Sequence, residues 1–493
     1  MRKVIPALQF AVCIVLLVSF AVPVQARNIT SPESYVFNRG GADRFIATPA
    51  PLPYRFVRSV QASDVGVNTF INLMEIEYHD ERFFITNGDT LIVTDNDFNA
   101  TDIIRGIEVD GRWEYFTALD GIFITFEGEI YVAEPGAGRI LHFDAELNLI
   151  RVLGRPEGIL IDDEIPYRPT KVAVDNHGRI YVVAENVFQG IVEMNPDGTF
   201  NRFFGVVEVR FTATELFLRS LQTQAQRARA RLWLPVNFTN LAVDPDGFIF
   251  ATMSDAGTDV GAKKLNARGE NIMRRPFDDH FVGDLYYNTF GFGVPIGPSI
   301  MSIIQVNDFG VYYLFDSNRN RVFAYDQDGH MLFAFGGSGT REGFTQSVTG
   351  MTMASGSRLV FADRGNRSIE VFRRTQYGEL VLSAVERQFH NDYMGAAYYW
   401  RQVIDMNQFF QYAHLGVGIA LYRQGLFEEA IPYFQRGQAV DFYSMAFQRV
   451  RADNMYQNFN MIVLSVLVLV VIIVVVKVYR RLQLIRKDRG IVV

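Results

Sequence analysis

The stretch Glu127–Asp144, EGEIYVAEPGAGRILHFD, places a glycine-rich turn between two short apolar runs. This pattern predicts two antiparallel strands joined by a tight turn. A similar stretch, HGRIYVVAENVFQGIVEMN, begins again at His177. A unit that recurs at this spacing in a strand-rich chain is typical of a β-propeller or a solenoid.

The first strand of this hairpin recurs in six copies. They read DTLIVTD, GEIYVAE, GRIYVVA, GFIFATM, GVYYLFD and SRLVFAD, and they start at Asp89, Gly128, Gly178, Gly247, Gly310 and Ser357, at spacings of 39, 50, 69, 63 and 47 residues. Further apolar runs flank each copy, with turns such as DNHG and DPDG between them. Asn, Asp and Gly suit tight hairpin turns because they tolerate a positive φ. Four short strands per unit, repeated six times, predict an all-β six-bladed propeller.

The segment PYRFVRSV, Pro53 to Val60, precedes the first complete unit and has the pattern of a strand. We expect it to pair with the last unit and to close the ring. Closure removes the exposed sheet edges that would otherwise invite aggregation.

The stretches VAVDNHGRIYVV, DSNRNRVFAYDQDGHMLFAFGGSG and FADRGNRSIEVF resemble NHL repeats, and the resemblance covers about Pro53 to Phe389. It implies a six-bladed propeller in a family with protein-, RNA- and peptide-binding members and several enzymes. We place the propeller domain at residues 53–376.

The chain begins with Arg2 and Lys3, a long apolar run, and small residues ending at Ala26. This order is typical of a secretory signal peptide, here residues 1–26, which a linker at residues 27–52 follows. The one cysteine, Cys13, lies in the apolar run, so the mature chain has no thiol for a disulfide, a thiolate metal site or a nucleophile.

Residues 458–479 are almost entirely apolar and long enough to span a bilayer, which takes about 20 residues. A basic tail at residues 480–493 follows. The positive-inside rule then predicts a single-pass protein of the cell membrane with a cytoplasmic C-terminal tail and the N-terminal ectodomain outside.

Between propeller and span, residues 377–457 change to a helical period. Gly418, Gly425, Ala430 and Phe434 match the small and aromatic positions of a tetratricopeptide repeat, and Ala396 precedes Ala430 by that repeat's period of 34 residues. The segment, which we call tetratricopeptide-like, forms either a peptide-binding groove or a helical spacer that docks the propeller. We favour the spacer, because two units are fewer than an independent array needs.

Position seven of the template is acidic in four copies, at Asp95, Glu134, Asp316 and Asp363. A ring of these carboxylates near the channel is a candidate site for a divalent metal or a cationic ligand. In the alternative that we favour, each acid belongs to a turn and binds backbone amides or a nearby arginine, such as Arg139 or Arg321.

A second candidate is a basic cluster in the insertion Phe211–Val236, where Thr212 and Glu215 form a capping box that starts a helix. Its arginines are candidates for contact with lipid phosphates or an acidic partner, although a solvated helix end is the favoured interpretation. They are Arg227, Arg229 and Arg231.

The whole layout resembles bacterial surface proteins labelled NHL-repeat or gluconolactonase-like, which implies a neighbourhood of sugar-type ABC transporter components. The sequence contains no G-x-S-x-G, H-E-x-x-H or P-loop motif, and no catalytic or cofactor-binding residue is assigned. The net charge of −7 is spread along the chain, so no nucleic-acid partner is expected. We predict a membrane-anchored extracellular binding or scaffold protein with a protein partner. The alternative is a metal-dependent lactonase or lyase acting on a sugar derivative in the channel.

Overall fold

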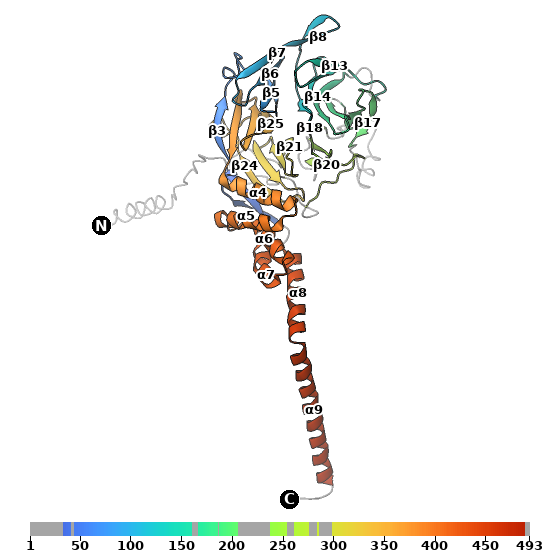
Figure 1. Cartoon of the computed structure of the whole chain (residues 1–493), viewed down its shortest axis with the longest axis vertical. Helices are drawn as coiled ribbons and strands as arrows, with labels where there is room; N and C mark the ends of the chain where they lie inside the picture. Colours follow the sequence, from blue (N-terminus) through green and yellow to red (C-terminus); the bar gives the residue numbers. More distant parts are fainter. Residues whose placement is uncertain are drawn as a thin grey trace, which may run out of the picture.

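A computed structural model describes residues 33–40, 44–159, 166–185, 187–205, 237–253, 261–275, 283–284 and 298–488. The predicted signal peptide and the arginines at 227, 229 and 231 lie outside these residues. The described chain forms a propeller, a group of short helices beside it, and a long helical rod that leaves the propeller (Figure 1).

Six of the seven sheets formed by the described residues are the blades of the predicted propeller. Blade 1 is formed by β4 (Leu73–His79), β5 (Arg82–Asn87), β6 (Thr90–Thr94) and β7 (Ala100–Ile104). Blade 2 is formed by β10 (Ile122–Ile124), β11 (Ile130–Glu134), β12 (Arg139–Phe143) and β13 (Leu149–Leu153). Blade 3 is formed by β14 (Arg168–Val174), β15 (Ile180–Glu185), β16 (Ile191–Met194) and β17 (Phe200–Phe204).

The remaining blades are built in the same way. Blade 4 has the described strands β18 (Phe238–Val243), β19 (Ile249–Met253) and β20 (Ala262–Leu265). Blade 5 contains β21 (Met301–Val306), β22 (Tyr312–Asp316), β23 (Arg321–Tyr325) and β24 (Met331–Gly336). Blade 6 contains β25 (Val348–Ala354), β26 (Arg358–Asp363) and β27 (Ser368–Arg374), and its fourth strand comes from the N-terminal part of the chain.

That fourth strand is β3 (Tyr54–Val60), which pairs antiparallel with β27 from Val60 opposite Ile369 to Tyr54 opposite Arg374. The predicted closure of the ring is therefore confirmed. The ring of Tyr54 is buried and stacks on Phe335 of blade 5 at 5.2 Å between centroids, so the closing strand also packs between two blades.

Blade 5 is wider than predicted, because a hairpin of β1 (Glu33–Gly40) and β2 (Arg44–Pro49) extends it to six strands. Residues Glu33 to Tyr35 of β1 pair with β24. Most of the segment 27–52, which the sequence placed in a linker, is therefore part of the sheet. The short polar ESYVFNRG run gave no repeat signal.

One repeat was assigned to the wrong strand. The copy DTLIVTD lies on β6, the third strand of blade 1, whereas the other five copies lie on second strands. The second strand of blade 1 is β5, whose sequence RFFITN lacks both the leading glycine and the final acid. Asn87 therefore occupies the position that is acidic in blades 2, 5 and 6.

Strand direction defines two faces of the ring. The loop face carries the connections between blades and the turns between second and third strands. The turn face carries the turns between first and second and between third and fourth strands. A two-stranded hairpin, β8 (Gly106–Val109) and β9 (Arg112–Tyr115), lies in the connection between blades 1 and 2 on the loop face, and in Figure 1 it is at the end of the propeller farthest from the rod.

Six helices follow blade 6, as α4 (Gln376–Phe389), α5 (Tyr393–Met406), α6 (Gln411–Arg423), α7 (Phe427–Arg436), α8 (Val440–Gln457) and α9 (Phe459–Asp488). Thr375 and Asp392 cap the first two, because their side chains accept hydrogen bonds from the amides of Gly378 and Gly395. A Cβ atom on Gly418 would lie 2.6 Å from the ring of Phe434, so a small residue here does let two helices approach closely. The helical segment is confirmed, and its tetratricopeptide-like character stays a prediction.

The burial of Tyr54 gives the first testable prediction. Tyr54→Ala removes a buried ring between blades 5 and 6 and should lower the free energy of unfolding by about 3–5 kcal/mol. The matched control on the same strand is Val57→Ala, whose side chain is exposed and whose change should stay within about 0.5 kcal/mol. Chemical denaturation of both variants measures the difference, and equal midpoints would contradict closure by β3.

Candidate functional site

The acids predicted as a ring do not meet. Glu134 is buried at the end of β11, where one oxygen accepts hydrogen bonds from the amide and hydroxyl of Thr117 at 2.9 and 3.1 Å. Its other oxygen pairs with Arg139 at 2.7 Å, as the turn interpretation predicts. Arg139 also contacts Glu114 of β9 at 2.5 Å. Glu134 therefore holds the connection that carries the β8–β9 hairpin.

Asp363 and Asp316 play the same part in their own blades. Asp363 accepts hydrogen bonds from the amides of Gln346 and Ser347 at 2.8 and 2.9 Å. Asp316 accepts from the amide of Ile300 at 3.0 Å and pairs with Arg319 at 3.1 Å. The arginine named from the sequence, Arg321, instead pairs with Asp284 at 3.2 Å.

Asp95 is different because it lies in the exposed turn between β6 and β7. Its carboxylate accepts hydrogen bonds from the side-chain amide of Asn99 at 2.7 Å and from the backbone amides of Asn99 and Asp97, each at 2.9 Å. These bonds to the charged form, that of the Asn99 side chain first, hold the pKa of Asp95 below its usual value. Asp144 makes the same contacts in blade 2. The four predicted acids thus satisfy separate turns.

A different set of polar side chains meets in the ring. Its members lie on or beside the first strands of the blades, which contact one another around the axis. We call this set the channel cluster, and it consists of Glu75, Glu77, Asp120, Lys171, Gln305 and Thr352.

Lys171 of β14 is the centre of one half of the cluster. Its ammonium group lies 2.6 Å from a carboxylate oxygen of Glu75 on β4 and 3.1 Å from one of Asp120, just before β10. The side chains of all three are almost entirely removed from solvent. One cation therefore joins blade 3 to blade 1 and to the start of blade 2.

Glu77 is the centre of the other half. One of its oxygens accepts a hydrogen bond from the side-chain amide of Gln305 in blade 5 at 3.0 Å, and the other accepts from the hydroxyl of Thr352 in blade 6 at 3.2 Å. Blade 4 joins through Asn240, whose side-chain oxygen accepts from the amide of Ile304 at 3.2 Å. Polar contacts thus link the inner strands around the ring.

Burial controls the charges of the cluster. It raises the pKa of Glu77 to about 8, with a further increase from the charge of Glu75. Burial also raises the pKa of Glu75, against the opposing effect of Lys171. For Lys171 burial acts to lower the pKa, but the attraction of Asp120 and Glu75 is stronger, so the net pKa is above its usual value. Lys171 is therefore a fixed cation rather than a nucleophile.

This chemistry does not fit a divalent ion. A metal site needs several free carboxylate or imidazole donors around one point. Lys171 already neutralises two of the channel acids, and the predicted ring acids are bound to their turns. Within the described ranges, no group of three or more His, Cys, Asp or Glu side chains is arranged to hold a metal ion.

The channel cluster was missed at the sequence level, although it left a signal. Glu75 and Glu77 interrupt an apolar strand as LMEIEYH, and Lys171 interrupts RPTKVAV. Charged residues two apart in a first strand point to the same side, here toward the axis. Their partners lie in other blades and are far away along the chain, so no local sequence pattern identifies them.

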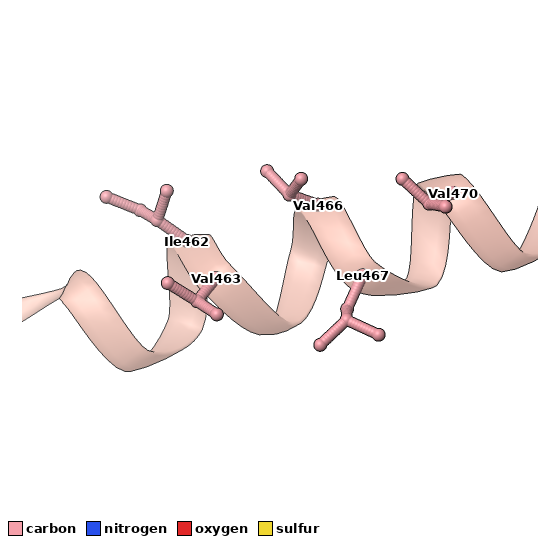
Figure 2. Close-up of a pocket in the computed structure, with 5 residues that line it drawn as sticks. All are labelled: Ile462, Val463, Val466, Leu467 and Val470. Atoms are coloured by element: carbon pink, nitrogen blue, oxygen red, sulfur yellow. The ribbon is translucent and has the colours of Figure 1, made fainter.

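The helix α9 carries a shallow hollow on one side. Figure 2 shows it between aliphatic side chains one and two turns apart, which are Ile462, Val463, Val466, Leu467 and Val470. No polar side chain lines it, so it offers no orienting group for a small ligand. The segment Phe459–Ile485 is the one described helix that is long and apolar enough to cross a membrane, and none of it is buried by the protein.

Comparison with known proteins gives structural neighbours only. No protein-family model matches the chain, and no curated protein matches it. Among solved structures, it is similar to a gluconolactonase from Xanthomonas campestris with 12% identity and a TM-score of 0.40, over 66% of this chain and 97% of that one. It is similar to a streptogramin B lyase with 12% identity and a TM-score of 0.39, over 66% of this chain and 100% of the other.

A third neighbour is virginiamycin B lyase from Staphylococcus aureus, with 12% identity and a TM-score of 0.37, over 65% of this chain and 100% of that chain. At these identities and scores the likeness assigns neither an activity nor a ligand to this protein.

Removal of the channel cation tests the cluster. Lys171→Met leaves Glu75 and Asp120 buried without their counterion and should lower the free energy of unfolding at pH 7 by about 3–5 kcal/mol. The control Lys263→Met changes a half-buried lysine that lies over the ring of Phe238 at 5.6 Å, and should change stability by about 1 kcal/mol or less. Equal losses in the two variants would contradict the pairing.

The raised pKa of Glu77 predicts a dependence of stability on pH. The folded state keeps the proton up to about pH 8, whereas the usual value of 4.5 applies when the chain unfolds. The proton therefore stabilises the fold fully below the lower pKa, and this stabilisation is lost as the pH rises through the higher one.

Glu77→Gln should remove this component, which is on the order of 2–4 kcal/mol. The groups that face Glu77 are Glu75, Lys171, Gln305 and Thr352, and they are present in both proteins. Denaturation midpoints at pH 5 and pH 9 provide the measurement, with the wild type expected to fall more steeply than the variant. Parallel profiles would show that Glu77 is ionised throughout.

Proposed function

We propose that this protein is a membrane-anchored binding or scaffold protein that presents the loop face of its propeller to a partner protein. The observation that carries the proposal is the hydrophobic core shared by blades 5 and 6 and the helices. Buried residues of this core come from β3, β24, α4, α5 and α7, among them Tyr54, Phe335, Val381, Trp400 and Phe434. The propeller and the helices therefore share one packed core, which favours their behaving as one body rather than as two units on a flexible linker.

Polar contacts reinforce this junction. The hydroxyl of Tyr412 in α6 donates a hydrogen bond to the buried carboxylate of Asp326 in blade 5, and the ring of His330 stacks on Tyr412 at 4.4 Å. At the same junction, the side-chain amide of Asn38 in β1 donates to the backbone carbonyl of Phe409 at 2.7 Å. These contacts lie between the turn face and the helices, so part of the turn face is already covered.

The anchor follows from the same helices. The rod of α8 and α9 leads away from the propeller in Figure 1. Tyr456 and Phe459 are exposed at the start of the apolar helix, and Tyr479 is exposed near its end. Aromatic residues at both ends of an apolar helix suit the two membrane interfaces. An ectodomain outside the cell and a basic tail inside, as the sequence predicts, agree with this arrangement.

The loop face provides the free surface. The β8–β9 hairpin exposes the side chains of Trp113 (59%) and Tyr115 (73%), whose rings meet edge to face at 6.3 Å. Trp and Tyr contribute strongly to protein interfaces because they bury a large area with little loss of side-chain entropy. Components of a sugar-type ABC transporter are the partners that the family resemblance suggests.

Affinity purification from gently solubilised, crosslinked membranes tests the proposal. The wild type should recover a defined protein partner, and the double variant Trp113→Ala with Tyr115→Ala should recover at least tenfold less. Phe126→Ala is the matched control, because Phe126 is 95% exposed in the turn between β10 and β11, on the turn face. If the wild type recovers no partner, or if the control loses it equally, docking through the loop face is wrong.

The alternative function, a metal-dependent lactonase or lyase acting on a sugar derivative, gains no specific support from the described residues. Its candidate acids are bound to turns, and the channel acids face Lys171. The purified full chain should leave lactones unchanged with added calcium, zinc or manganese. Metal-dependent turnover that Glu75→Gln abolishes would restore the enzyme hypothesis.

A further inference from the structure

Blade 6 places arginines side by side near the turn face. Arg358 of β26 lies directly opposite Arg373 of β27, and Arg373 lies directly opposite Arg55 of β3. Directly paired residues of antiparallel strands point to the same side of the sheet. We call these three residues the arginine row. Neighbouring strands are about 4.8 Å apart, so the row extends over about 10 Å.

A fourth arginine lies beside the row. The guanidinium of Arg58 donates to the backbone carbonyl of Asp97 at 2.9 Å and lies 5.5 Å from the ring centroid of Phe98, in blade 1. Arg358 also reaches blade 1, where it donates to the backbone carbonyl of Asn96 at 2.9 Å. The side of blade 6 that carries the row therefore faces blade 1.

None of these four arginines forms an ion pair with a described residue. Arg358 and Arg58 bind neutral acceptors, and Arg55 and Arg373 are exposed. The next arginine along β27 provides a contrast, because Arg374 pairs with Glu379 of α4 at 3.0 Å. Arg374 thus has a carboxylate within ion-pair distance, whereas among the described residues the row has none, in a chain whose net charge is −7.

The like charges affect one another. Burial lowers the pKa of Arg358. The attraction of Tyr78 and Asp97 opposes this effect, and the smaller repulsion from Arg373 and Arg58 adds to it. Like charges directly opposite each other destabilise a sheet. A bound anion would neutralise the repulsion between arginines that lie opposite one another on three neighbouring strands.

We propose that the arginine row binds a chain of linked phosphate groups. Guanidinium groups bind phosphate oxygens through two parallel hydrogen bonds, and Arg keeps its charge at every physiological pH. A row of about 10 Å accommodates successive phosphates of one chain better than a single ion. This site lies on the opposite face from the β8–β9 hairpin, and it does not depend on the proposed protein partner.

The test uses the full chain in detergent with tripolyphosphate as the probe, and inorganic phosphate for comparison. We expect saturable binding of tripolyphosphate at least tenfold tighter than that of phosphate, a higher melting temperature on binding, and weakening at high salt. The double variant Arg55→Gln with Arg373→Gln should bind at least tenfold more weakly. Arg387→Gln is the control, because it removes a positive charge in α4 that is also exposed but pairs with Asp392.

The variants also distinguish an anion-binding site from a row of arginines that repel one another and bind nothing. Without ligand, the double variant should melt at a slightly higher temperature than the wild type, because repulsion is relieved. Tripolyphosphate should then raise the melting temperature of the wild type and of Arg387→Gln but not that of the double variant. An equal response in all three proteins, or no response in the wild type, would overturn the proposal.

Discussion

The pairing of β3 with β27 is the constraint on which the rest of the structure depends. It joins the N-terminal part of the chain to the last blade and so closes the ring of sheets. The start of β3 also contacts the first helix. The backbone carbonyl of Pro53, just before β3, accepts a hydrogen bond at 2.9 Å from the backbone amide of Thr375, the N-cap residue of α4. Gly378 is needed there, since a Cβ atom would lie 2.3 Å from that carbonyl. The residues that close the ring therefore also hold the start of the helical segment that leads to the apolar helix α9.

The charged groups of the propeller serve this closure rather than an evident reaction. Glu134, Asp316 and Asp363 each tie the connection before a blade to the end of its second strand. Near the axis, by contrast, Lys171 and Glu77 form bonds that join different blades. Such buried polar contacts add little net stability, but they leave costly unpaired groups if the blades shift. They therefore favour one arrangement of the six sheets over its neighbours.

The fold could be predicted from the sequence wherever a repeated local pattern determines it. The second strands with their glycine turns identified the blades, and the alternating pattern at Pro53 to Val60 identified the closing strand. Blade 1 was misread because β5 and β6 are both apolar and only β6 ends near an acid, Asp95. The β1–β2 hairpin and the channel cluster were missed because their contacts join segments far apart in the chain. Burial of Glu75 beside Lys171 depends on tertiary structure alone.

We infer that the propeller and the helices α4 to α7 form one rigid body next to the apolar helix α9. Amide hydrogen exchange of the full chain in detergent tests it most directly, because exchange reports the free energy of local opening. We expect β3, α4 and α6 to be protected to a similar degree as the inner strand β25, and to lose protection together with it in mild denaturant. If the amides of α4 to α7 exchange through openings of low free energy while those of β25 stay protected, the propeller and the helices are not one rigid body.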